Sequence, residues 1–549
     1  MNYRLFFAAI LSVFITFQSC KTKSEPQLAN TTTEIRQWKP EDTRSITGVN
    51  EKRGLILNSE EATPGYVLFQ PSSSTETFLI NKKGEVVHKW TGELNCMQSY
   101  LQDNGNLIRL ERDIDFPTFA AGGQAGRIRE YDWDGNMLWD YEYATETELI
   151  HHDIEILPNG NILAISYEVI TPEEAAAAGR DPEHTAKAGI WPDKIIEIKP
   201  QRPEGGEVVW EWRMWDHIVQ DRDSTKPNFG TVAEHPRKID VNAGGGEAGQ
   251  PMTEEQITQM KKMGFLTSNA TADNQNSDIT HVNAVAYNAD LDQIAISSPH
   301  LHEIYIIDHS IGTAEARGEA GDLLYRWGNP QNYGRGTEED QVLYGQHDIK
   351  WIPKGYPGAG NLMVFNNDIP EPGNKMPSVW AAIMQAQSPD PQVKIEDIGN
   401  YSAVHEFSPP MDNSGSYEIK ENAPFGPEKT QWDYMAPDKY SFYSAFISGA
   451  QRLKNGNTLI TSGAKGRFFE VTANKEIVWE YWNPYVHHYV LPDGSASQPT
   501  GPFIYGQFRA TQFTPDFPAF QNKDLKPIQP QPETFEFKMP SPPENANVQ

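Results

Sequence analysis

Short runs of alternating apolar and polar residues recur along the chain, and each ends in an aromatic residue. Most of these runs begin at a Gly or Asn turn, and their β-branched and aromatic residues predict strands. Six runs follow the pattern: 84–90, 135–139, 206–212, 321–327, 431–434 and 476–481. The pattern therefore predicts a chain built from repeated units.

A second recurring element lies between these runs: an Asn-Gly turn, or its equivalent, followed by another apolar strand. Asn-Gly between two apolar runs is the strongest short signal for a β-hairpin. These turns and strand starts are at 104–107, 159–162, 292–294, 360–362 and 455–458. Each unit then contains four antiparallel strands joined by tight turns and one loop, which is the blade of a propeller.

Six aromatic endings predict an all-β fold, a six-bladed β-propeller with helical and loop insertions between blades. The intervals 90–139 and 432–479 each have the length of one blade, about 40–50 residues. The longer intervals require insertions near 213–277 and 367–440. A seven-bladed propeller, with one blade hidden in an insertion, is the alternative.

Two helices are predicted within the insertions. A capping-box pattern at Thr253, followed by apolar residues at helical spacing, predicts a helix that ends near Gly264. A second helix is expected after Thr171, through a run of alanines to Gly179. We interpret both as decorations of one propeller face and not as separate domains.

The composition limits the possible partners. The 549 residues carry a net charge of −29, and the pI is about 4.9. Nucleic acid binding requires clustered Lys and Arg, so nucleic acid is not an expected partner. An anionic substrate would need a locally positive pocket, which histidines can help to supply.

The first 20 residues predict an export signal. Arg4 supplies a positive charge, and the apolar run over 5–17 is shorter than the about 20 residues that span a membrane. The run ends at Cys20 in a pattern that resembles a bacterial lipobox, whose cysteine is lipidated. A non-lipidated secretory signal is the alternative. The chain is therefore expected to be exported by a Gram-negative bacterium. It would be a membrane-anchored lipoprotein that faces the periplasm or the cell surface.

This interpretation divides the chain into four parts. They are a lipoprotein signal peptide over 1–20, a polar tether over 21–50, a catalytic β-propeller over 51–520 and a Pro-rich tail over 521–549 that is extended or disordered. Cys96 is the only cysteine besides Cys20. With Cys20 lipidated, a disulfide within the chain and a Cys-based zinc site are both excluded.

Three histidines, His152, His281 and His347, each open an apolar run that ends in a turn signal, and each belongs to a different unit. In the last unit the same place holds Ser448 or Gln451. The innermost strands of a propeller line its central channel, so residues where these strands begin should face one another. The three histidines are therefore candidates for one active site.

Clustered histidines serve two kinds of chemistry. They ligate Zn, Cu, Ni or Fe, usually together with carboxylates. They also act as nucleophiles and as acid–base groups near neutral pH, where imidazole titrates. The residues alone leave both uses open.

Several short motifs occur in a fixed order among the predicted strands of residues 60–520. They are Trp215-Asp216-His217-Ile218-Val219-Gln220-Asp221, Ala233-Glu234-His235-Pro236, His281-Val282-Asn283, Ile307-Asp308-His309-Ser310, Tyr325-Arg326-Trp327-Gly328-Asn329-Pro330, Gly345-Gln346-His347-Asp348, Phe365-Asn366-Asn367, Ser448-Gly449-Ala450-Gln451-Arg452 and Phe469-Glu470-Val471. In this order they resemble the bacterial aryl-sulfate sulfotransferases, in the branch with insertions of this kind.

The resemblance implies a six-bladed propeller that moves a sulfuryl group from a phenolic sulfate ester to a phenol through a sulfohistidine. His347 matches the nucleophile, and His152 and His281 match the histidines that bind the sulfate and handle the phenol proton. Asp348 or a backbone carbonyl could orient the His347 tautomer. The implied partners are small aryl sulfates and phenols, with no cofactor, metal or nucleotide donor.

One position departs from the family pattern. The family has an arginine after a Ser-Ser pair, where this chain has Pro299. A proline has no N–H to offer an anion. The candidate substrate-binding residues that could compensate or lie beside the histidines are His300, Arg452, Asn283 and Gln346, and the chain also offers Arg467 and Arg509.

Two other functions fit the same residues. A propeller-type polysaccharide lyase would abstract a proton next to a uronate, with Tyr344, close to His347 in sequence, as its acid. A non-catalytic ligand-binding propeller lipoprotein would use the histidines to hold a structural metal. The resemblance favours the sulfotransferase.

Overall fold

The structure is a computed structural model. It describes residues 48–72, 74–113, 118–244, 253–262, 269–371, 399–412, 415–486 and 503–537. All of them belong to one compact unit, Gln37–Gln549. The expected signal peptide with Cys20, nearly all of the tether and the end of the Pro-rich tail lie outside the described residues. Among the helices described, none has the length and apolar character needed to cross a membrane.

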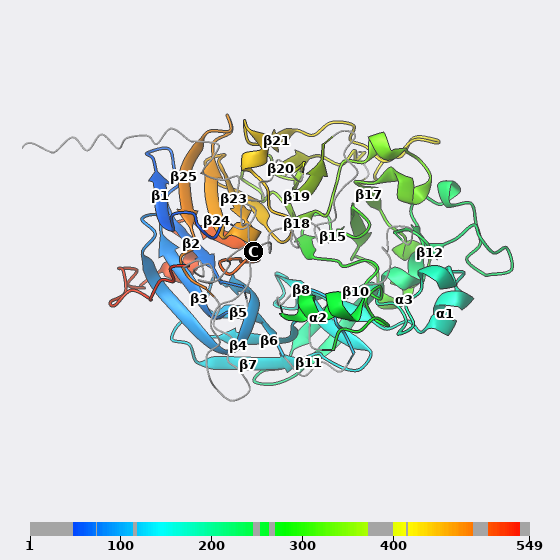
Figure 1. Cartoon of the computed structure of the whole chain (residues 1–549), viewed down its shortest axis with the longest axis horizontal. Helices are drawn as coiled ribbons and strands as arrows, with labels where there is room; N and C mark the ends of the chain where they lie inside the picture. The colour runs from blue at the N-terminus through cyan, green and yellow to red at the C-terminus, as the bar shows by residue number, and fades with distance from the viewer. Residues whose placement is uncertain are drawn as a thin grey trace, which may run out of the picture. The chain divides into compact units, whose positions relative to one another are not determined.

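Antiparallel sheets make up most of the regular structure (Figure 1). Three of them have four strands in sequence order. They are β8 (Glu148–Ile156), β9 (Ile162–Glu168), β10 (Asp193–Pro200) and β11 (Gly206–Arg213); β14 (Ala284–Asn288), β15 (Gln293–Ser298), β16 (Glu303–Asp308) and β17 (Tyr325–Trp327); and β18 (His347–Trp351), β19 (Leu362–Pro370), β20 (Asn400–Phe407) and β21 (Trp432–Tyr434). The prediction of a mostly-β chain with repeated four-stranded units is confirmed.

Two larger sheets take in strands from both ends of the described chain. The first joins β22 (Gly449–Arg452), β23 (Thr458–Ser462), β24 (Arg467–Val471) and β25 (Ile477–Trp482) to β1 (Gly54–Asn58). The second runs in the order β26 (Ala510–Phe513), β2 (Tyr66–Phe69), β3 (Ser74–Asn81), β4 (Val86–Leu101), β5 (Leu107–Arg112), β6 (Gly126–Tyr131) and β7 (Met137–Glu142). Strand β4 is shared, because residues 86–91 pair with β3 and residues 95–101 pair with β5.

The first strands of successive sheets contact one another in a closed series. Strand β8 contacts β14, β14 contacts β18, β18 contacts β22, and β22 contacts β26. The seven-stranded sheet that contains β26 returns to β8 through β4 and β5. The sheets therefore form a ring, and the starts of their first strands come together.

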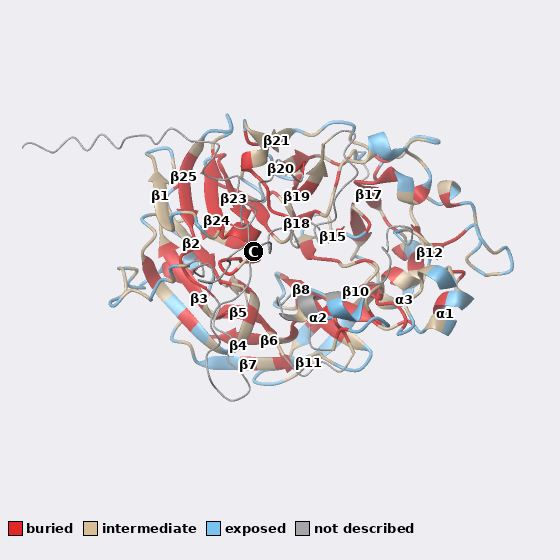
Figure 2. Cartoon of the chain, viewed as in Figure 1, coloured by how far each residue is buried: buried red, intermediate tan, exposed pale blue. Residues whose placement is uncertain are grey.

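Apolar clusters fill the spaces between neighbouring sheets, as Figure 2 shows by the buried residues concentrated on the strands. One cluster joins Ile165 and Trp212 of one sheet to Ile296 and Tyr305 of the next. The next cluster continues from Ile304 to Val364 in the following sheet. Side chains from two sheets thus share each core, so no sheet buries its apolar face alone.

The recurring tryptophans of the sequence tie each sheet unit to the following one. Each indole N–H donates to a backbone carbonyl just ahead of the last strand of the next unit. The pairs are Trp90 with Asp132, Trp139 with Gly205, Trp212 with Gly321, Trp327 with Pro427, Trp432 with Ala473 and Trp479 with Lys82. The last pair returns to the first unit. A largely buried indole needs such a partner for its N–H, which explains why tryptophan recurs there.

The two predicted helices are confirmed. Helix α1 (Pro172–Ala177) is capped by Thr171, whose side chain and that of Glu174 form the reciprocal capping box. Helix α2 (Glu254–Lys262) follows Thr253, and the short α3 (Thr313–Ala316) was not predicted. A two-stranded parallel sheet, β12 (Ile218–Val219) and β13 (Ile239–Asp240), lies in the first insertion.

Part of the Pro-rich tail lies against the sheets. The Ile528 N–H donates to the Val86 carbonyl at 2.9 Å, and the Phe535 N–H donates to the Pro484 carbonyl at 2.9 Å. Over residues 521–537 the structure has turns and bends but no helix or strand. Hydrogen bonds of the Gln531 side chain with Val86 and apolar packing of Ile528 and Phe535 also hold this segment, which joins no sheet.

Candidate active site

The structure brings His152, His281 and His347 together from three different sheets. The ring centroids of His152 and His281 are 4.4 Å apart. The Phe508 ring, just ahead of β26, lies 6.0 Å from the His152 ring and 6.5 Å from the His347 ring. Residues far apart in the sequence therefore form one cluster along the first strands. His347 begins β18 and His281 lies just ahead of β14, but His152 lies inside β8, at a register shift, and does not open its strand as predicted.

The backbone at and beside these histidines is strained. His152 and His281 have φ of 56° and 52°, and Asp348, which follows His347, has φ of 60°. In the last unit Ile447 and Ser448 also have positive φ, 49° and 91°. Residues other than glycine rarely adopt this conformation, which costs about 1–3 kcal/mol each and persists only where the surroundings enforce it. Because the same strain recurs in several units, the surrounding structure must hold these residues in a backbone conformation that they do not favour on their own.

His152 is held by a second histidine. His151 Nδ1 lies 2.7 Å from His152 Nδ1. The His151 ring stacks on Tyr167 with centroids 3.5 Å apart. Its Nε2 lies 2.7 Å from Asp193 Oδ1, although this contact is too bent to be a hydrogen bond. The Asp193 charge favours a proton on His151 Nε2, so His151 Nδ1 accepts from His152 Nδ1–H. His152 Nε2 then carries the lone pair.

Burial lowers the pKa of His152 well below its ordinary value, and the neighbouring His281 and His151 lower that pKa further. The His152 side chain is therefore a neutral base near neutral pH. Asp193 also accepts hydrogen bonds from Thr280 Oγ1 at 2.6 Å and from the Val282 N–H at 2.7 Å. The same carboxylate thus positions both the His152 relay and the segment that carries His281.

His281 has the opposite electrostatic setting. Its Nδ1 bonds to Asp278 Oδ2. Tyr167 donates to the same oxygen at 3.1 Å. Burial opposes the charged imidazole, but the Asp278 carboxylate outweighs it and raises the pKa of His281. Burial also disfavours the charged carboxylate, but His281 lowers the pKa of Asp278 to about 2. The pair therefore carries a proton next to the neutral His152.

His347 is fixed as one neutral tautomer. Its Nδ1 lies 3.0 Å from the Gly345 carbonyl and 2.9 Å from Asn367 Oδ1. The Asn367 amide nitrogen donates to Ser444 O and Ile447 O, so its oxygen must face the histidine. Both neighbours accept, so Nδ1 is the protonated nitrogen and Nε2 carries the lone pair.

The lone pair of His347 Nε2 accepts a hydrogen bond from the Ile447 N–H at 3.2 Å. Burial lowers the pKa of His347 to about 3, against the opposing effect of its bond to Asn367. The side chain is neutral and therefore nucleophilic near neutral pH. The Gly345 carbonyl, and not Asp348, orients the tautomer.

Four of the basic and amide side chains predicted as candidates are engaged within the protein. Asn283 Nδ2 donates to the Gln346 carbonyl at 2.8 Å. Gln346 Nε2 donates to Ser298 O and Glu303 O. Both residues are fully buried and link neighbouring sheets. Arg452 pairs with Glu406, and Arg467 pairs with Glu480.

Arg452 illustrates the correction. It lies three residues along β22 from Gly449, whose position contacts Asp348, and so about 10 Å further from the cluster. Arg509 lies in the cluster, but its guanidinium already binds Asp153, Asp348 and the Asn283 carbonyl. Of the four candidate substrate-binding residues, the structure leaves His300 beside the histidines. Its ring stacks on His281 with centroids 4.6 Å apart.

Several residues of the cluster were missed from the sequence: His151, Asp193, Asp278, Asn367 and Phe508. His151 adjoins His152, and Asn367 lies in one of the family-like motifs, so their position was visible although their contacts were not. Asp193 and Phe508 carry no local signal, because each reaches the site from a separate segment through tertiary packing. Asp278 lies only three residues before His281, so its position was visible although its contact was not.

A glycine loop covers the histidines. A Cβ atom added to Gly123 would lie 2.0 Å from His152 Cε1, and one added to Gly122 would lie 3.3 Å from His281 Cε1. The Gly123 carbonyl also accepts from the His152 N–H at 2.8 Å. The loop therefore approaches so closely that no side chain fits at Gly123.

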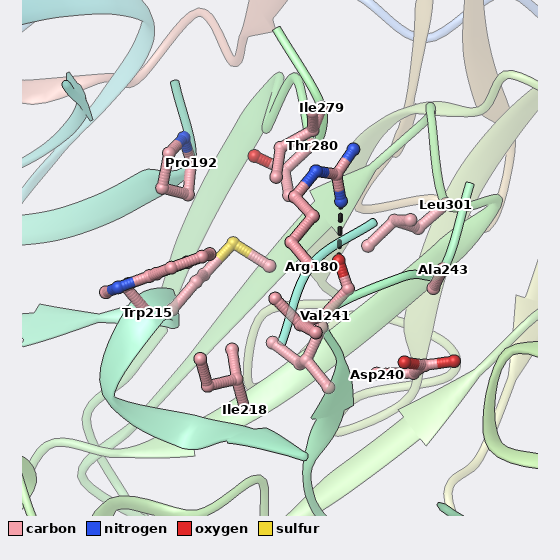
Figure 3. Close-up of a pocket in the computed structure, with 12 residues that line it drawn as sticks. Arg180, Pro192, Trp215, Ile218, Asp240, Val241, Ala243, Ile279, Thr280 and Leu301 are labelled. Atoms are coloured by element: carbon pink, nitrogen blue, oxygen red, sulfur yellow. Dashed lines mark hydrogen bonds between the residues drawn. The ribbon is translucent and has the colours of Figure 1, made fainter. Parts of the chain in front are cut away.

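A separate small cavity is lined in part by Thr280 (Figure 3). Its walls are mainly apolar and include Trp215, Ile218 and Leu301. Arg180 reaches into it and donates to the Val241 carbonyl at 2.5 Å. The described histidine cluster does not line this cavity.

The sheets and the site define a class: a mostly-β protein of several four-stranded antiparallel sheets that gathers buried histidines where its first strands begin. Residues 51–483 match the family model described as Arylsulfotransferase (ASST). The chain belongs to this family of aryl-sulfate sulfotransferase enzymes.

The search of curated proteins gave no relative of the chain. Three solved structures illustrate the similar folds. A protein of unknown function from Bacteroides caccae is 11% identical, with 82% of this chain and 99% of that chain covered and a TM-score of 0.37. Virginiamycin B lyase from Staphylococcus aureus is 12% identical, with 78% and 89% covered and a TM-score of 0.30. The Cps50 (Swd1) β-propeller domain of Myceliophteria thermophila is 9% identical, with 79% and 91% covered and a TM-score of 0.34.

Proposed function

We propose that this protein transfers a sulfuryl group from a phenolic sulfate ester to a phenol through a sulfohistidine formed on His347. One observation carries the choice of residue. His347 is neutral, and its Nδ1–H is held by Gly345 and Asn367, so that Nε2 alone offers a lone pair. Family membership supplies the class of substrates, aryl sulfates and phenols.

The fold proposed for this function is a six-bladed propeller. Division of the seven-stranded sheet at β4 gives two four-stranded units, and the other four antiparallel sheets give one each. The six indole-to-carbonyl bonds support the same count, because they join six units and return to the first. The seven-bladed alternative has no counterpart in this series.

In the first step, His347 Nε2 attacks the sulfur of the donor ester. The N–S bond forms while the bond from sulfur to the aryl oxygen breaks, and the phenolate leaves with the electron pair. The protonated His281, beside Asp278, can give its proton to that oxygen. The Ile447 N–H must release Nε2 for the attack, because both would use the same lone pair.

In the second step, an acceptor phenol attacks the sulfur and the N–S bond breaks, which returns the electron pair to His347 Nε2. The neutral His152 can take the phenol proton, because His151 holds its Nδ1 and leaves Nε2 as the base. His281 and His152 are thus assigned opposite proton-transfer roles. The raised pKa of His281 suits an acid, and the lowered pKa of His152 suits a group that is free to accept a proton.

We also propose that the protein is exported and anchored by a lipid on Cys20, facing the periplasm or the cell surface. The support is the sequence pattern of residues 1–20. A Cys20→Ser variant should leave the membrane fraction and lose incorporation of labelled fatty acid. Retention of the label in that variant would refute the anchor.

The sulfohistidine is tested by mass. The purified protein is mixed with a chromogenic aryl sulfate in the absence of a phenol, and the intact mass is measured. The expected result is the gain of one sulfuryl group, its loss when a phenol is added, and neither change in His347→Ala. The control His184→Ala removes an imidazole from a 3₁₀ turn away from the cluster and should behave as the wild type does. A sulfuryl group retained in His347→Ala would assign the nucleophile elsewhere.

A further inference from the structure

We propose that Asp278, His281 and His300 form a binding site for a divalent transition-metal ion. Each offers one ligand atom, and the three atoms all lie within 4.8 Å of one another. The site borders the histidine cluster, but ion binding there does not depend on sulfuryl transfer.

The carboxylate supplies the first argument. Its Oδ2 bonds to His281 Nδ1, but its Oδ1 is buried without a hydrogen-bond partner among the described residues. The Asp278 side chain is only 10% exposed. A buried carboxylate oxygen with no donor is costly, and a bound cation would satisfy it. His300 Nδ1 lies 4.0 Å from that oxygen.

The two imidazoles supply the second argument. The His281 and His300 rings are stacked with an interplanar angle of 19°. His281 Nδ1 bonds to the Asp278 carboxylate, and His300 Nδ1 donates to the Asp278 backbone carbonyl at 3.0 Å. The His300 side chain is 47% exposed, whereas that of His281 is 17% exposed. His300 therefore forms the solvent side of the site and gives an ion a way in. To ligate through Nδ1, its ring would give up the bond to the Asp278 carbonyl and carry its proton on Nε2.

The donor set indicates the kind of ion. Two imidazole nitrogens and one carboxylate oxygen suit Zn²⁺, Fe²⁺, Ni²⁺ or Cu²⁺, whereas Mg²⁺ and Ca²⁺ prefer oxygen ligands throughout. Tyr167 donates to Asp278 Oδ2 at 3.1 Å, which is the outer hydrogen bond that orients a ligating carboxylate. Three protein ligands leave at least one position for water or an anion.

Binding would exchange a proton for the ion. The proton that His281 Nδ1 shares with Asp278 leaves to solvent, and the nitrogen lone pair is donated to the metal. No oxidation or reduction is involved. The ion would add positive charge beside His152, whose ring lies 4.4 Å from that of His281. In sulfuryl transfer the ion would take the place of the His281 proton and would face the anionic oxygens of the donor, a consequence that rests on the proposed function.

The test is a metal titration of the purified full-length chain after chelator treatment. Co²⁺ is added first, because a cobalt ion bound by imidazole and carboxylate absorbs visible light more strongly than the free ion does. Zn²⁺ should then displace it, and calorimetry should give one equivalent per chain. Absence of saturable binding of both ions would overturn the proposal.

Variants locate the ion. His300→Ala and Asp278→Asn each remove one ligand, and each should weaken Zn²⁺ binding by more than the about 10–100-fold that loss of an outer partner costs. His184→Ala removes an imidazole outside the cluster and should bind as the wild type does. Because His300 is half exposed, its replacement should not unfold the chain, which thermal unfolding checks. Unchanged affinity in the Asp278→Asn, His300→Ala double variant would overturn the site.

These measurements use no sulfate ester. If the wild-type protein takes up a sulfuryl group but binds no metal, the metal site is refuted and the sulfohistidine stands. If it binds metal but takes up no sulfuryl group, the sulfohistidine is refuted and the metal site stands.

Discussion

Arg509 Nη1 donates to the Asp153 carboxylate at 2.7 Å, and Arg509 Nε lies 2.9 Å from Asp348. Asp153 follows His152, and Asp348 follows His347. One guanidinium, held just ahead of β26, therefore ties together the two segments that carry these histidines. Each aspartate also accepts from the backbone of the following sheet, Asp153 from the Val285 N–H and Asp348 from the Ala450 N–H. The same contacts close the ring of sheets and organise the site.

Replacement of Arg509 by methionine should strongly destabilise the protein. The change leaves Asp153 and Asp348 buried without their cation, which typically costs about 3–5 kcal/mol in the free energy of unfolding. Arg317→Met is the matched control, since Arg317 pairs with Glu211 at the surface, where an ion pair contributes about 1 kcal/mol or less. Urea unfolding measures both. Equal losses would show that Arg509 is not the organising residue.

Asn367 is a positioning residue for His347. Asn367→Ala removes one of the two acceptors that hold His347 Nδ1–H, so the Nε2 lone pair should lose its fixed direction. We expect the rate of sulfuryl uptake to fall by about 10²-fold, the scale of a misplaced reacting group. The control Asn136→Ala affects an exposed turn and should leave the rate unchanged. If Asn367→Ala lowers the rate only by lowering the fraction of folded protein, the result would contradict a positioning role.

His347 should also make stability fall in acid. Burial keeps the pKa of the folded imidazole at about 3, whereas the unfolded chain takes up a proton near the ordinary value of about 6.5. Between these values the unfolded state binds more protons. Above about pH 6.5 this residue therefore does not lower the free energy of unfolding. As the pH falls from there toward 3, it lowers the free energy of unfolding progressively.

The variant His347→Gln tests this dependence. It removes the titrating group, so its urea midpoint should fall less than that of the wild type between about pH 7 and about pH 4.5. His184→Gln should follow the wild type, because that imidazole is outside the buried cluster. The same fall in wild type and His347→Gln would show that His347 is not the buried neutral group described.

The indole ring of hydrogen bonds can be tested at one position. Trp212→Phe removes the donor to the Gly321 carbonyl, which is buried, and an unpaired buried acceptor costs about 1–3 kcal/mol. Trp351→Phe makes the same side-chain change, but the Trp351 Nε1–H is buried with no hydrogen-bond partner among the described residues. Thermal unfolding should therefore show the larger loss at Trp212. Equal losses would mean that the indole contributes by volume alone.

The sequence predicted the strands well because their signals are local. Alternation and Asn-Gly turns depend on neighbouring residues, so β9, β15 and β23 begin where their turns predict. The recurrence of tryptophan was equally visible. The reason for this recurrence was not visible, because the acceptor of Trp212 is Gly321, in the next unit and 109 positions away.

The site divides in the same way. Histidines at matching strand starts could be expected to meet, since a repeat places them alike. Two of their partners could not be predicted, because Asp193 and Arg509 arrive from segments with no repeat pattern. Adjacency in sequence was misleading for Asn283 and Gln346. Asn283 and Gln346 precede β14 and β18, and tertiary contacts turn both side chains to backbone carbonyls of neighbouring segments.

The close approach of Gly123 to His152 gives a last test. A Cβ atom at this position would overlap the His152 ring, and φ of 71° would strain any other residue. Gly135 has φ of 87° but nothing within 4 Å of an added Cβ, so Gly135→Ala carries the strain without the clash. Both variants should lose about 1 kcal/mol or more in unfolding free energy. Only Gly123→Ala should lose phenol-dependent release of the sulfuryl group, because its clash displaces the base. Equal turnover in the two variants would show that the close approach of Gly123 is not needed for His152 to act as the base.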